Sequence, residues 1–382
     1  MWSKFSERAK LIKPSAIRKF FDIPGDVISL GVGEPDFDAS QPTVEAGIRA
    51  LKQGKTHYTP SSGIPELRRA VSQHLQSTYG VSYDPDHEIL LTVGASEALY
   101  LAVAALLNPG DEMIVITPCF VSYQGAIILA SGVPVEVPTR FEDGFAIDVT
   151  AVEAAITPKT KGILLGFPSN PTGLVASRET VKELCGLAVK YDLAIISDEI
   201  YDQLVYGVEH VCVPADPAVY DRTILLGGFS KAYAMTGFRI GYLAAPAEIM
   251  EGPYKMHQYL IMTAPTVSQY AALAAIQETE ADVKRMVAEY DRRRHLVVDR
   301  LKQIGLDLVI PQGAFYAFPR IKETGLDCET FALRLLEEEK VALIPGIGFG
   351  PGGEDCVRIS YATAYEKLEQ ALDRIERFVK KL

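Results

Sequence analysis

The sequence predicts an α/β protein, in which a large domain with a mostly parallel seven-stranded sheet flanked by helices is joined to a smaller α+β domain. Helical stretches are expected at 43–53, 64–79, 96–107, 120–131 and 177–191. They alternate with short apolar segments at 88–93, 112–117, 133–137, 161–167, 193–197, 223–227 and 239–244. Strands without a polar face are typical of parallel sheets that helices cover on both sides. Ligand sites in such sheets gather at the carboxyl ends of the strands.

The two ends of the chain predict the smaller domain. A long helix over 266–304, charged in its second half, would bridge two domains. A strand is expected at 27–32, behind an irregular arm whose short helix starts at Pro14 and Ser15. The remaining C-terminal elements are strands at 306–310, 315–319, 341–344 and 357–361 and helices at 327–340 and 363–381. We therefore predict that residues 1–42 form an N-terminal arm and part of the small domain. Residues 43–280 would form the large domain, and residues 281–382 the rest of the small domain.

Composition and charge exclude several classes of function. The chain has 382 residues, 48% of them hydrophobic, and a formal net charge of −11, which argues against nucleic acid or an acidic membrane surface as a partner. No apolar run approaches the length of a membrane span, and the charged N-terminus lacks the apolar stretch of a signal peptide. We therefore expect a cytoplasmic protein. The five cysteines and six histidines are scattered without metal-ligand spacing, so no metal site is expected.

Two glycine motifs suggest nucleotide binding but lie in the wrong context. Gly31-Val32-Gly33 follows a predicted strand, but Asp36 stands where the dinucleotide motif requires its third glycine. The segment 348–353 has the spacing of that motif, yet it precedes a predicted strand instead of opening a helix. Neither motif therefore supports a nucleotide site.

The segment 222–242 carries the main chemical signal. Its apolar strand breaks at Gly227 and Gly228, and Ser230-Lys231 follows at once. Because desolvation lowers the pKa of an amine, a lysine just past a buried strand is suited to forming a Schiff base. Arg239, eight positions further on, has a fixed fork of donors that can grip a phosphate. A solvated Lys-Arg pair on a loop is the alternative from these residues alone.

The whole block, from Phe229-Ser230-Lys231 through Met235-Thr236-Gly237-Phe238-Arg239-Ile240-Gly241-Tyr242, resembles the cofactor-lysine motif of the class I and II pyridoxal-phosphate-dependent aminotransferases. These enzymes have fold type I and include the aspartate and aromatic aminotransferases. The resemblance implies that Lys231 forms a Schiff base with the aldehyde of pyridoxal 5'-phosphate. It also implies that Arg239 binds the phosphate of the cofactor.

Gly94, Ala95 and Ser96 lie where one predicted strand ends and a helix begins. Free backbone amides and the helix dipole make such a place suitable for a phosphate, although an ordinary N-cap at Ser96 is the alternative. In the aminotransferases that the chain resembles, the same position cradles the cofactor phosphate. Many members also carry a phosphate-binding serine at the position of Gly228, which Ser230 or Ser96 would replace here.

Four further residues lie at the ends of predicted strands. Phe120 is either a core residue or a ring that stacks on the cofactor pyridine, as the resemblance implies. Asn170, in Asn-Pro-Thr-Gly, either stabilises a turn or, as the resemblance implies, donates a hydrogen bond to the phenolic oxygen of the cofactor. Asp198 is a helix cap or the carboxylate that keeps the pyridine nitrogen protonated, so that the ring accepts electrons. The resemblance assigns Tyr201 to the phenolic oxygen, where it would also lower the pKa of the Schiff base.

Three residues outside the strand ends complete the predicted site. Arg358 lies inside an apolar strand, where a buried arginine needs an anionic partner. An internal salt bridge would provide one, but the resemblance implies that Arg358 clamps the α-carboxylate of the substrate, with Gly33 close to the same substrate. Tyr58 resembles the tyrosine that reaches the phosphate of the neighbouring subunit, which implies a homodimer with shared active sites.

The reaction implied by the resemblance is ping-pong transamination from an L-amino acid to a 2-oxo acid such as 2-oxoglutarate, with Lys231 as proton shuttle. One subgroup of bacterial aspartate aminotransferases has a lysine at the position of Ser96 that reads the second substrate carboxylate. An aromatic or other neutral donor is therefore as well supported as aspartate. A pyridoxal-phosphate-dependent C–S lyase and a non-catalytic cofactor-sensing regulator of the same fold are the alternatives.

Overall fold

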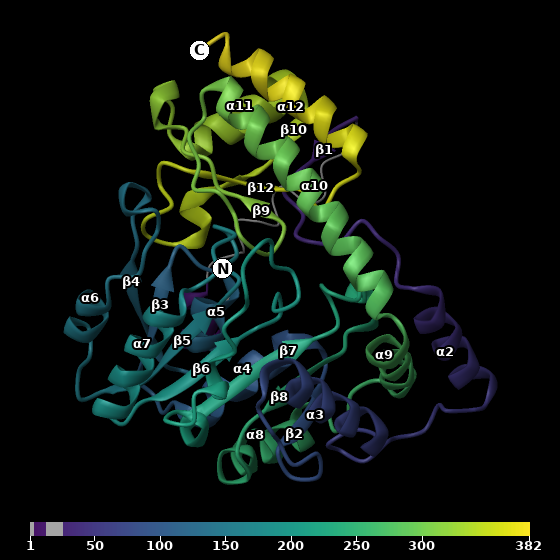
Figure 1. Cartoon of the computed structure of the whole chain (residues 1–382). Helices are drawn as coiled ribbons and strands as arrows, with labels where there is room; N and C mark the ends of the chain where they lie inside the picture. Colours follow the sequence, from purple (N-terminus) through teal and green to yellow (C-terminus); the bar gives the residue numbers. More distant parts are fainter. Residues whose placement is uncertain (1–3, 13–25) are drawn as a thin grey trace.

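The computed structural model of the protein describes residues 4–12 and 26–382 (Figure 1). Its main sheet has the strand order β2-β8-β7-β6-β5-β3-β4. The strands are β2 (Ile89–Thr92), β3 (Glu112–Thr117), β4 (Val133–Pro138), β5 (Thr160–Gly166), β6 (Ala194–Asp198), β7 (Thr223–Gly228) and β8 (Gly241–Ala244). Only β8 runs antiparallel to its neighbours β2 and β7, while the other pairs are parallel. The predicted mostly parallel seven-stranded sheet is confirmed.

Helices cover both faces of this sheet, as the apolar strands predicted. In β5, Leu164 packs in one hydrophobic cluster with α4 and α5, whereas Ile163 and Leu165 pack on the opposite face against α7. Neither face of the strand is therefore open to water, which is why its sequence lacks polar alternation. The helices between residues 41 and 278 are α2 (Gln41–Lys52), α3 (Pro65–Tyr79), α4 (Gly94–Leu106), α5 (Ser122–Leu129), α6 (Val149–Ala154), α7 (Arg178–Lys190), α8 (Ala247–Leu260) and α9 (Thr266–Glu278).

A smaller part of the fold combines short strands with long helices. β9 (Tyr316–Ala317), β11 (Ile344–Pro345) and β12 (Val357–Ser360) form an antiparallel sheet in the order β11-β12-β9. The helices are α10 (Glu280–Ile304), α11 (Cys328–Glu339) and α12 (Tyr365–Val379), and Figure 1 shows α10 extending from α9 to the other two near the C-terminus.

The N-terminal segment completes this smaller part. β1 (Ile28–Ser29) pairs in parallel with β10 (Val341–Ala342), and the carbonyl of Leu30 accepts a hydrogen bond from the amide of Ser360. The domain boundaries near residues 42 and 280 stay a prediction. The predicted helix start at Pro14 and Ser15 lies outside the described residues, which contain the short helix α1 (Glu7–Leu11) before it.

Two expected elements differ from the structure. The helix predicted over 266–304 is two helices, because Thr279 leaves the helical conformation and its hydroxyl donates to the carbonyl of Ala275 at 2.7 Å. The strand predicted over 306–310 is not formed. Its apolar residues divide between the core and solvent instead, since Leu306 is buried and Ile310 is 46% exposed.

The described chain also contains six short 3-10 turns, at Phe141–Asp143, Val213–Ala215, Tyr220–Arg222, Thr236–Phe238, Lys322–Thr324 and Gly346–Phe349. All five cysteines are buried and none forms a disulfide. Within the described ranges, no helix has the length and hydrophobicity needed to span a bilayer.

The core between α11 and α12 gives a direct test of this packing. Phe378 is fully buried and its ring lies edge-on to Phe331, with centroids 5.2 Å apart. We expect Phe378→Ala to lower the free energy of unfolding by about 3–5 kcal/mol, because the buried ring leaves a cavity. Leu333→Ala on α11 is the control, since Leu333 is half exposed. Denaturant unfolding that gives equal losses for the two variants would contradict this packing.

Candidate active site

One cavity, of about 220 Å³, collects most of the predicted site residues. Parallel strands end at a common edge of the sheet, and the antiparallel β8 begins at that edge, since Gly241 pairs with Thr92 and Gly228. Residues that follow the parallel strands therefore meet those that precede β8. The predicted residues that line the cavity are Gly33, Ala95, Ser96, Phe120, Asn170, Asp198, Tyr201, Ser230, Lys231, Arg239 and Arg358.

Two predicted residues lie outside this cavity lining. Gly94 lies directly behind it, because a Cβ atom built on Gly94 would be 2.8 Å from Nη2 of Arg239. Its φ of +69° is a second reason for glycine at the start of α4. Tyr58 is 78% exposed and does not line the cavity of its own chain.

The cavity also contains residues that the sequence analysis missed. Tyr123, in the first turn of α5, lies three positions after Phe120, which precedes the helix. Tyr316 comes from β9, far along the chain, and no local signal marks it. The other residues that were missed are Leu99, Pro168, Ile200 and Thr236.

Lys231 presents its amine at the centre of this arrangement. Its Nζ donates to the carbonyl oxygen of Gly33 at 2.7 Å. Burial lowers the pKa of Lys231 to about 8, although Glu34 opposes this effect, and the positive charges of Arg358 and Arg239 add to it. A substantial fraction of this amine is therefore neutral, and nucleophilic, near neutral pH.

Asp198 ends β6 and points its carboxylate into the same cavity. Oδ2 accepts a hydrogen bond from the hydroxyl of Tyr123 at 2.9 Å, and Oδ1 accepts one from the amide of Ile200 at 3.3 Å. Burial raises the pKa of Asp198 to about 6, while these two hydrogen bonds and Lys231 lower it. A cationic group placed against this carboxylate would therefore be favoured, because it would relieve the cost of burying the charge.

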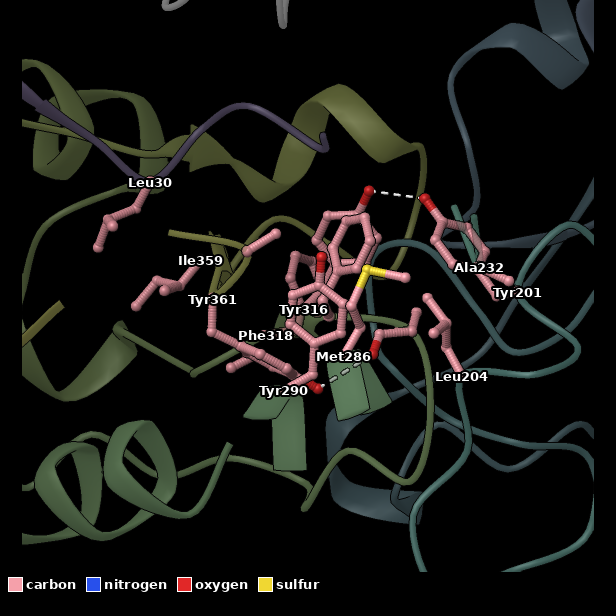
Figure 2. Packing of buried hydrophobic residues seen from close by; sticks show 14 of the residues in the cluster. Leu30, Tyr201, Leu204, Ala232, Met286, Tyr290, Tyr316, Phe318, Ile359 and Tyr361 are labelled. Carbon is pink, nitrogen blue, oxygen red and sulfur yellow. Dashed lines mark hydrogen bonds between the residues drawn. The ribbon is translucent and has the colours of Figure 1, made fainter. Parts of the chain in front are cut away.

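Tyr201 and Tyr316 bring the two parts of the fold together at the cavity. Their hydroxyl oxygens lie 2.7 Å apart, as Figure 2 shows among the aromatic side chains of the adjoining core. Burial raises the pKa of Tyr201 well above its usual value, so this phenol stays protonated and can donate a hydrogen bond. Gly33 must be glycine here, because a Cβ atom would lie 2.3 Å from the hydroxyl oxygen of Tyr316.

Anion-binding groups surround one end of the cavity. The helix α4 starts beside it, and no side chain caps the helix at Val93, so the first backbone amides of the helix are available to a ligand. Arg239 has a left-handed backbone with φ of +50°, a strained conformation that is typical of functional positions. Its Nη1 donates to the carbonyl of Thr236 at 2.9 Å, and within residues 4–12 and 26–382 no carboxylate pairs with it.

Among residues 4–12 and 26–382, Arg358 is a buried cation without a counter-ion. Only 2% of the residue is exposed, yet the guanidinium donates to neutral groups alone: Nη1 to Oδ1 of Asn170 at 2.8 Å and Nη2 to the carbonyl of Gly31 at 2.5 Å. Its Nε has no partner in the described part of the chain. The rings of Tyr316 and Phe349 face the guanidinium at 4.5 and 4.9 Å. Burial without an anion costs free energy, and a negatively charged ligand beside this arginine would offset that cost.

The cavity thus collects a buried lysine amine and two arginine side chains among its lining residues. The chain matches the family model "Aminotransferase class I and II" over residues 25–375. It is 46% identical to the aspartate aminotransferase of Pyrococcus abyssi over 381 residues, or 98% of each chain.

Solved structures agree with this assignment. The aromatic aminotransferase from Pyrococcus horikoshii superposes with a TM-score of 0.93 at 44% identity, over 98% of each chain. The aspartate aminotransferase from Thermus thermophilus with maleate has a TM-score of 0.92 at 39% identity, over 98% of this chain and 99% of that one. The chain therefore belongs to the aminotransferase class I and II family and is an aminotransferase. This family uses pyridoxal phosphate.

The lowered pKa of Lys231 can be measured in the cofactor-free protein. We expect trace acetylation of Lys231, followed by mass spectrometry, to rise with a midpoint near pH 8, because burial favours the neutral amine. Exposed lysines, with an ordinary pKa near 10.4, should become reactive only in more alkaline solution. A midpoint for Lys231 at that ordinary value would show that the amine is not desolvated.

Proposed function

We propose that the protein transfers the amino group of an L-amino acid to a 2-oxo acid, such as 2-oxoglutarate, by a ping-pong mechanism that uses pyridoxal phosphate bound at Lys231. The observation that carries this proposal is Arg358, a buried guanidinium that lines the same cavity as Lys231 and Arg239 and, among the described residues, donates only to the neutral groups of Asn170 and Gly31. Two arginines on one cavity suit two anions, the phosphate of a cofactor and the α-carboxylate of a substrate.

The residues present fit the phosphate end of pyridoxal phosphate. Ala95 and Ser96, in the first turn of α4, line the cavity together with Ser230 and Arg239. Backbone amides at a helix start, hydroxyl groups and a guanidinium are the usual donors to a phosphate. We propose that these groups, with Gly94 behind them, hold the phosphate.

The opposite end of the cavity fits the ring of the cofactor. Asp198 would lie against the pyridine nitrogen, Phe120 would pack on the ring face, and Asn170 and Tyr201 would hydrogen-bond the phenolic oxygen. Tyr123 supports this arrangement, because its hydroxyl fixes one oxygen of Asp198 at 2.9 Å. When bound, pyridoxal phosphate supplies an electron sink for the electron pair left at the substrate α-carbon.

Lys231 would both attach the cofactor and move the proton. Its Nζ, with the pKa lowered to about 8 by burial, can accept a proton at neutral pH and return it. Arg358 would hold the α-carboxylate bidentately and so orient the α-carbon toward this amine. Tyr201 and Tyr316, joined at 2.7 Å, would keep the site closed on the side of the small domain.

The cationic side chains that line the cavity indicate which class of amino acid the enzyme takes as its donor. Among the described residues, the cationic side chains that line the cavity are Lys231, Arg239 and Arg358. If these serve the cofactor and the α-carboxylate, the chain itself offers no further cation for a second carboxylate. Phe120 and Ile200 instead offer apolar surface. This arrangement supports an aromatic or other neutral donor, while the similarity to aspartate aminotransferases supports aspartate.

We also propose that two copies of the chain form a homodimer with shared sites. Tyr58 projects into solvent, 78% exposed, and cannot serve the cavity of its own chain. An exposed apolar surface is available on α8 and the residues after it, where Tyr259 is 95% and Met262 48% exposed. Such a surface is typical of an interface. Sedimentation of the cofactor-loaded protein as a monomer would contradict this assembly.

The test of the proposed function is to follow the visible spectrum of the cofactor-loaded protein while single L-amino acids are added. We expect an aromatic amino acid or aspartate to change the cofactor absorbance and yield the matching 2-oxo acid, and 2-oxoglutarate to restore the spectrum. Lys231→Ala should bind substrate without sustained turnover, because it lacks the amine that moves the proton. Release of pyruvate and ammonia without any acceptor would instead identify a C–S lyase, and the absence of cofactor binding would overturn the proposal.

Substitution of Arg358 tests the carboxylate clamp separately. We expect Arg358→Gln to lower kcat/KM for the amino acid about a hundredfold, since a buried charged partner is lost. The affinity for pyridoxal phosphate should fall much less than kcat/KM, because Arg358 would reach the cofactor only indirectly, through Asn170. Arg358→Lys keeps the charge without the fork and should recover only part of the loss. An unchanged kcat/KM in Arg358→Gln would exclude the clamp.

A further inference from the structure

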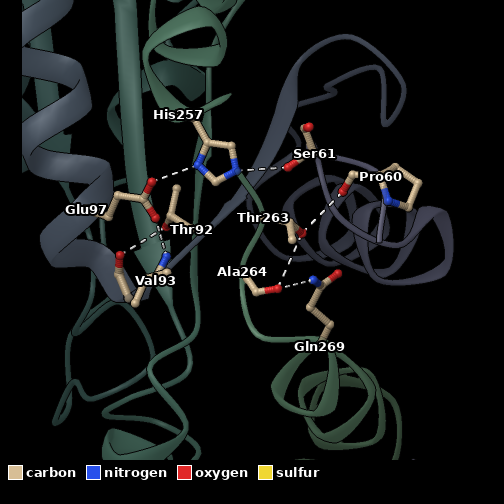
Figure 3. A network of polar contacts seen from close by, with 10 residues as sticks. Pro60, Ser61, Thr92, Val93, Glu97, His257, Thr263, Ala264 and Gln269 are labelled. Atoms are coloured by element: carbon tan, nitrogen blue, oxygen red, sulfur yellow. Dashed lines mark hydrogen bonds and ion pairs between the residues drawn. The ribbon is translucent and has the colours of Figure 1, made fainter. Parts of the chain in front are cut away.

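A buried ion pair lies behind the phosphate end of the cavity. Figure 3 shows His257, from α8, with Nδ1 2.7 Å from Oε1 of Glu97, in the first turn of α4. The other ring nitrogen, Nε2, lies 3.0 Å from the carbonyl oxygen of Ser61. The imidazole is completely buried and the carboxylate side chain is 5% exposed, so water does not screen the pair.

The hydrogen bonds of this pair determine its net charge. The carbonyl of Ser61 can only accept, so Nε2 of His257 must carry a proton and donate it. The contact between Nδ1 and Glu97 then needs one more proton, which belongs either to the imidazole or to the carboxyl group. In the first case the pair is His⁺ and Glu⁻, and in the second both are neutral. The pair therefore has no net charge in either arrangement.

The position of Glu97 makes this neutrality important. Oε2 of Glu97 accepts a hydrogen bond from the amide of Val93 at 2.6 Å, so its carboxylate lies beside the residue that precedes α4. Ala95 and Ser96, two and three positions after Val93, line the cavity. An ionised carboxylate at this helix start would repel a phosphate bound to the same turn, whereas a neutralised one would not. Within the described chain, His257 is the basic side chain that pairs with Glu97.

We propose that His257 is a positioning residue for the phosphate of the cofactor: it cancels the charge of Glu97 and lets Glu97 fix the start of α4 without repelling the ligand. This inference rests on the proposed function, because it takes the first turn of α4 as the phosphate site. The same imidazole also holds the carbonyl of Ser61, in the segment that carries Tyr58. His257 thus links the phosphate-binding turn to the surface proposed to meet a second subunit.

The experiment compares two probes, pyridoxal phosphate and pyridoxal, which differ only in the phosphate. Each is titrated by absorbance into the cofactor-free full-length protein. For His257→Gln we expect the affinity for pyridoxal phosphate to fall about tenfold or more, since an unpaired buried carboxylate then faces the phosphate. The affinity for pyridoxal should change less than threefold. The double variant His257→Gln/Glu97→Gln should recover the affinity for pyridoxal phosphate, because no charge remains to be cancelled.

Two further variants distinguish an electrostatic role of His257 from a purely structural one. Glu97→Gln alone removes the charge and should keep the affinity for pyridoxal phosphate within about threefold of the wild-type value. His210→Gln is the matched control. His210 is similarly buried and pairs with a glutamate, Glu199, at 2.6 Å, but Glu199 follows Asp198 in the sequence and does not belong to α4. Its effect on pyridoxal and on pyridoxal phosphate should be equal.

The outcomes distinguish this inference from the proposed function. A wild-type protein that binds neither probe would overturn the proposed function and this inference with it. Binding to the wild type with an unchanged affinity in His257→Gln would overturn the inference alone. Equal losses for both probes, or a double variant as weak as His257→Gln, would show that His257 acts only as a structural residue. If His257→Gln does not fold, as judged by circular dichroism, a loss of phosphate affinity in Glu97→Gln overturns the inference and its retention supports it.

Discussion

The direction of the strands is the constraint on which the site depends. Parallel pairing places the carboxyl ends of β3, β5, β6 and β7 at one edge of the sheet, and β2 ends there as well. Because β8 runs in the opposite direction, its first residue lies at that same edge, paired with Thr92 and Gly228. Arg239 is thereby brought back toward Lys231 across a turn with strained backbone at Ala234 and Arg239. A parallel β8 would have carried Arg239 to the far edge.

The second constraint is the positive charge that this edge concentrates. Lys231, Arg239 and Arg358 line one cavity, and the two arginines lower the pKa of the lysine. This arrangement destabilises the free protein, because like charges repel and Arg358 is buried without an anion. Anionic ligands remove that cost, so they should bind tightly and stabilise the fold when they bind. The chain as a whole has a formal net charge of −11, so its positive potential is local to the site.

The sequence predicted those parts of the fold and site that local patterns determine. Apolar strands and the polar residues that follow them could be read directly, so the residues from Gly94 to Arg239 fell at the expected edge. Tyr316 could not be found in this way, since its contact with Tyr201 spans 115 residues and depends on how the small domain packs. The break at Thr279 was missed for the opposite reason, because one threonine in a long run of helix-forming residues is a weak local signal.

The structure contains two buried histidine–glutamate pairs, and the glutamate of each directly follows a residue that lines the cavity. Glu199 follows Asp198 directly, and its negative charge raises the pKa of Asp198. His210 lies 2.6 Å from Glu199, which raises the pKa of that histidine even though burial opposes the charge. A proton on His210 would offset the charge of Glu199 and so favour the ionised form of Asp198. The second pair is formed by His257 and Glu97, whose Nδ1 and Oε1 atoms lie 2.7 Å apart. In both places a carboxylate accepts a hydrogen bond from a backbone amide, Val213 in one case and Val93 in the other, and a histidine contacts the same carboxylate.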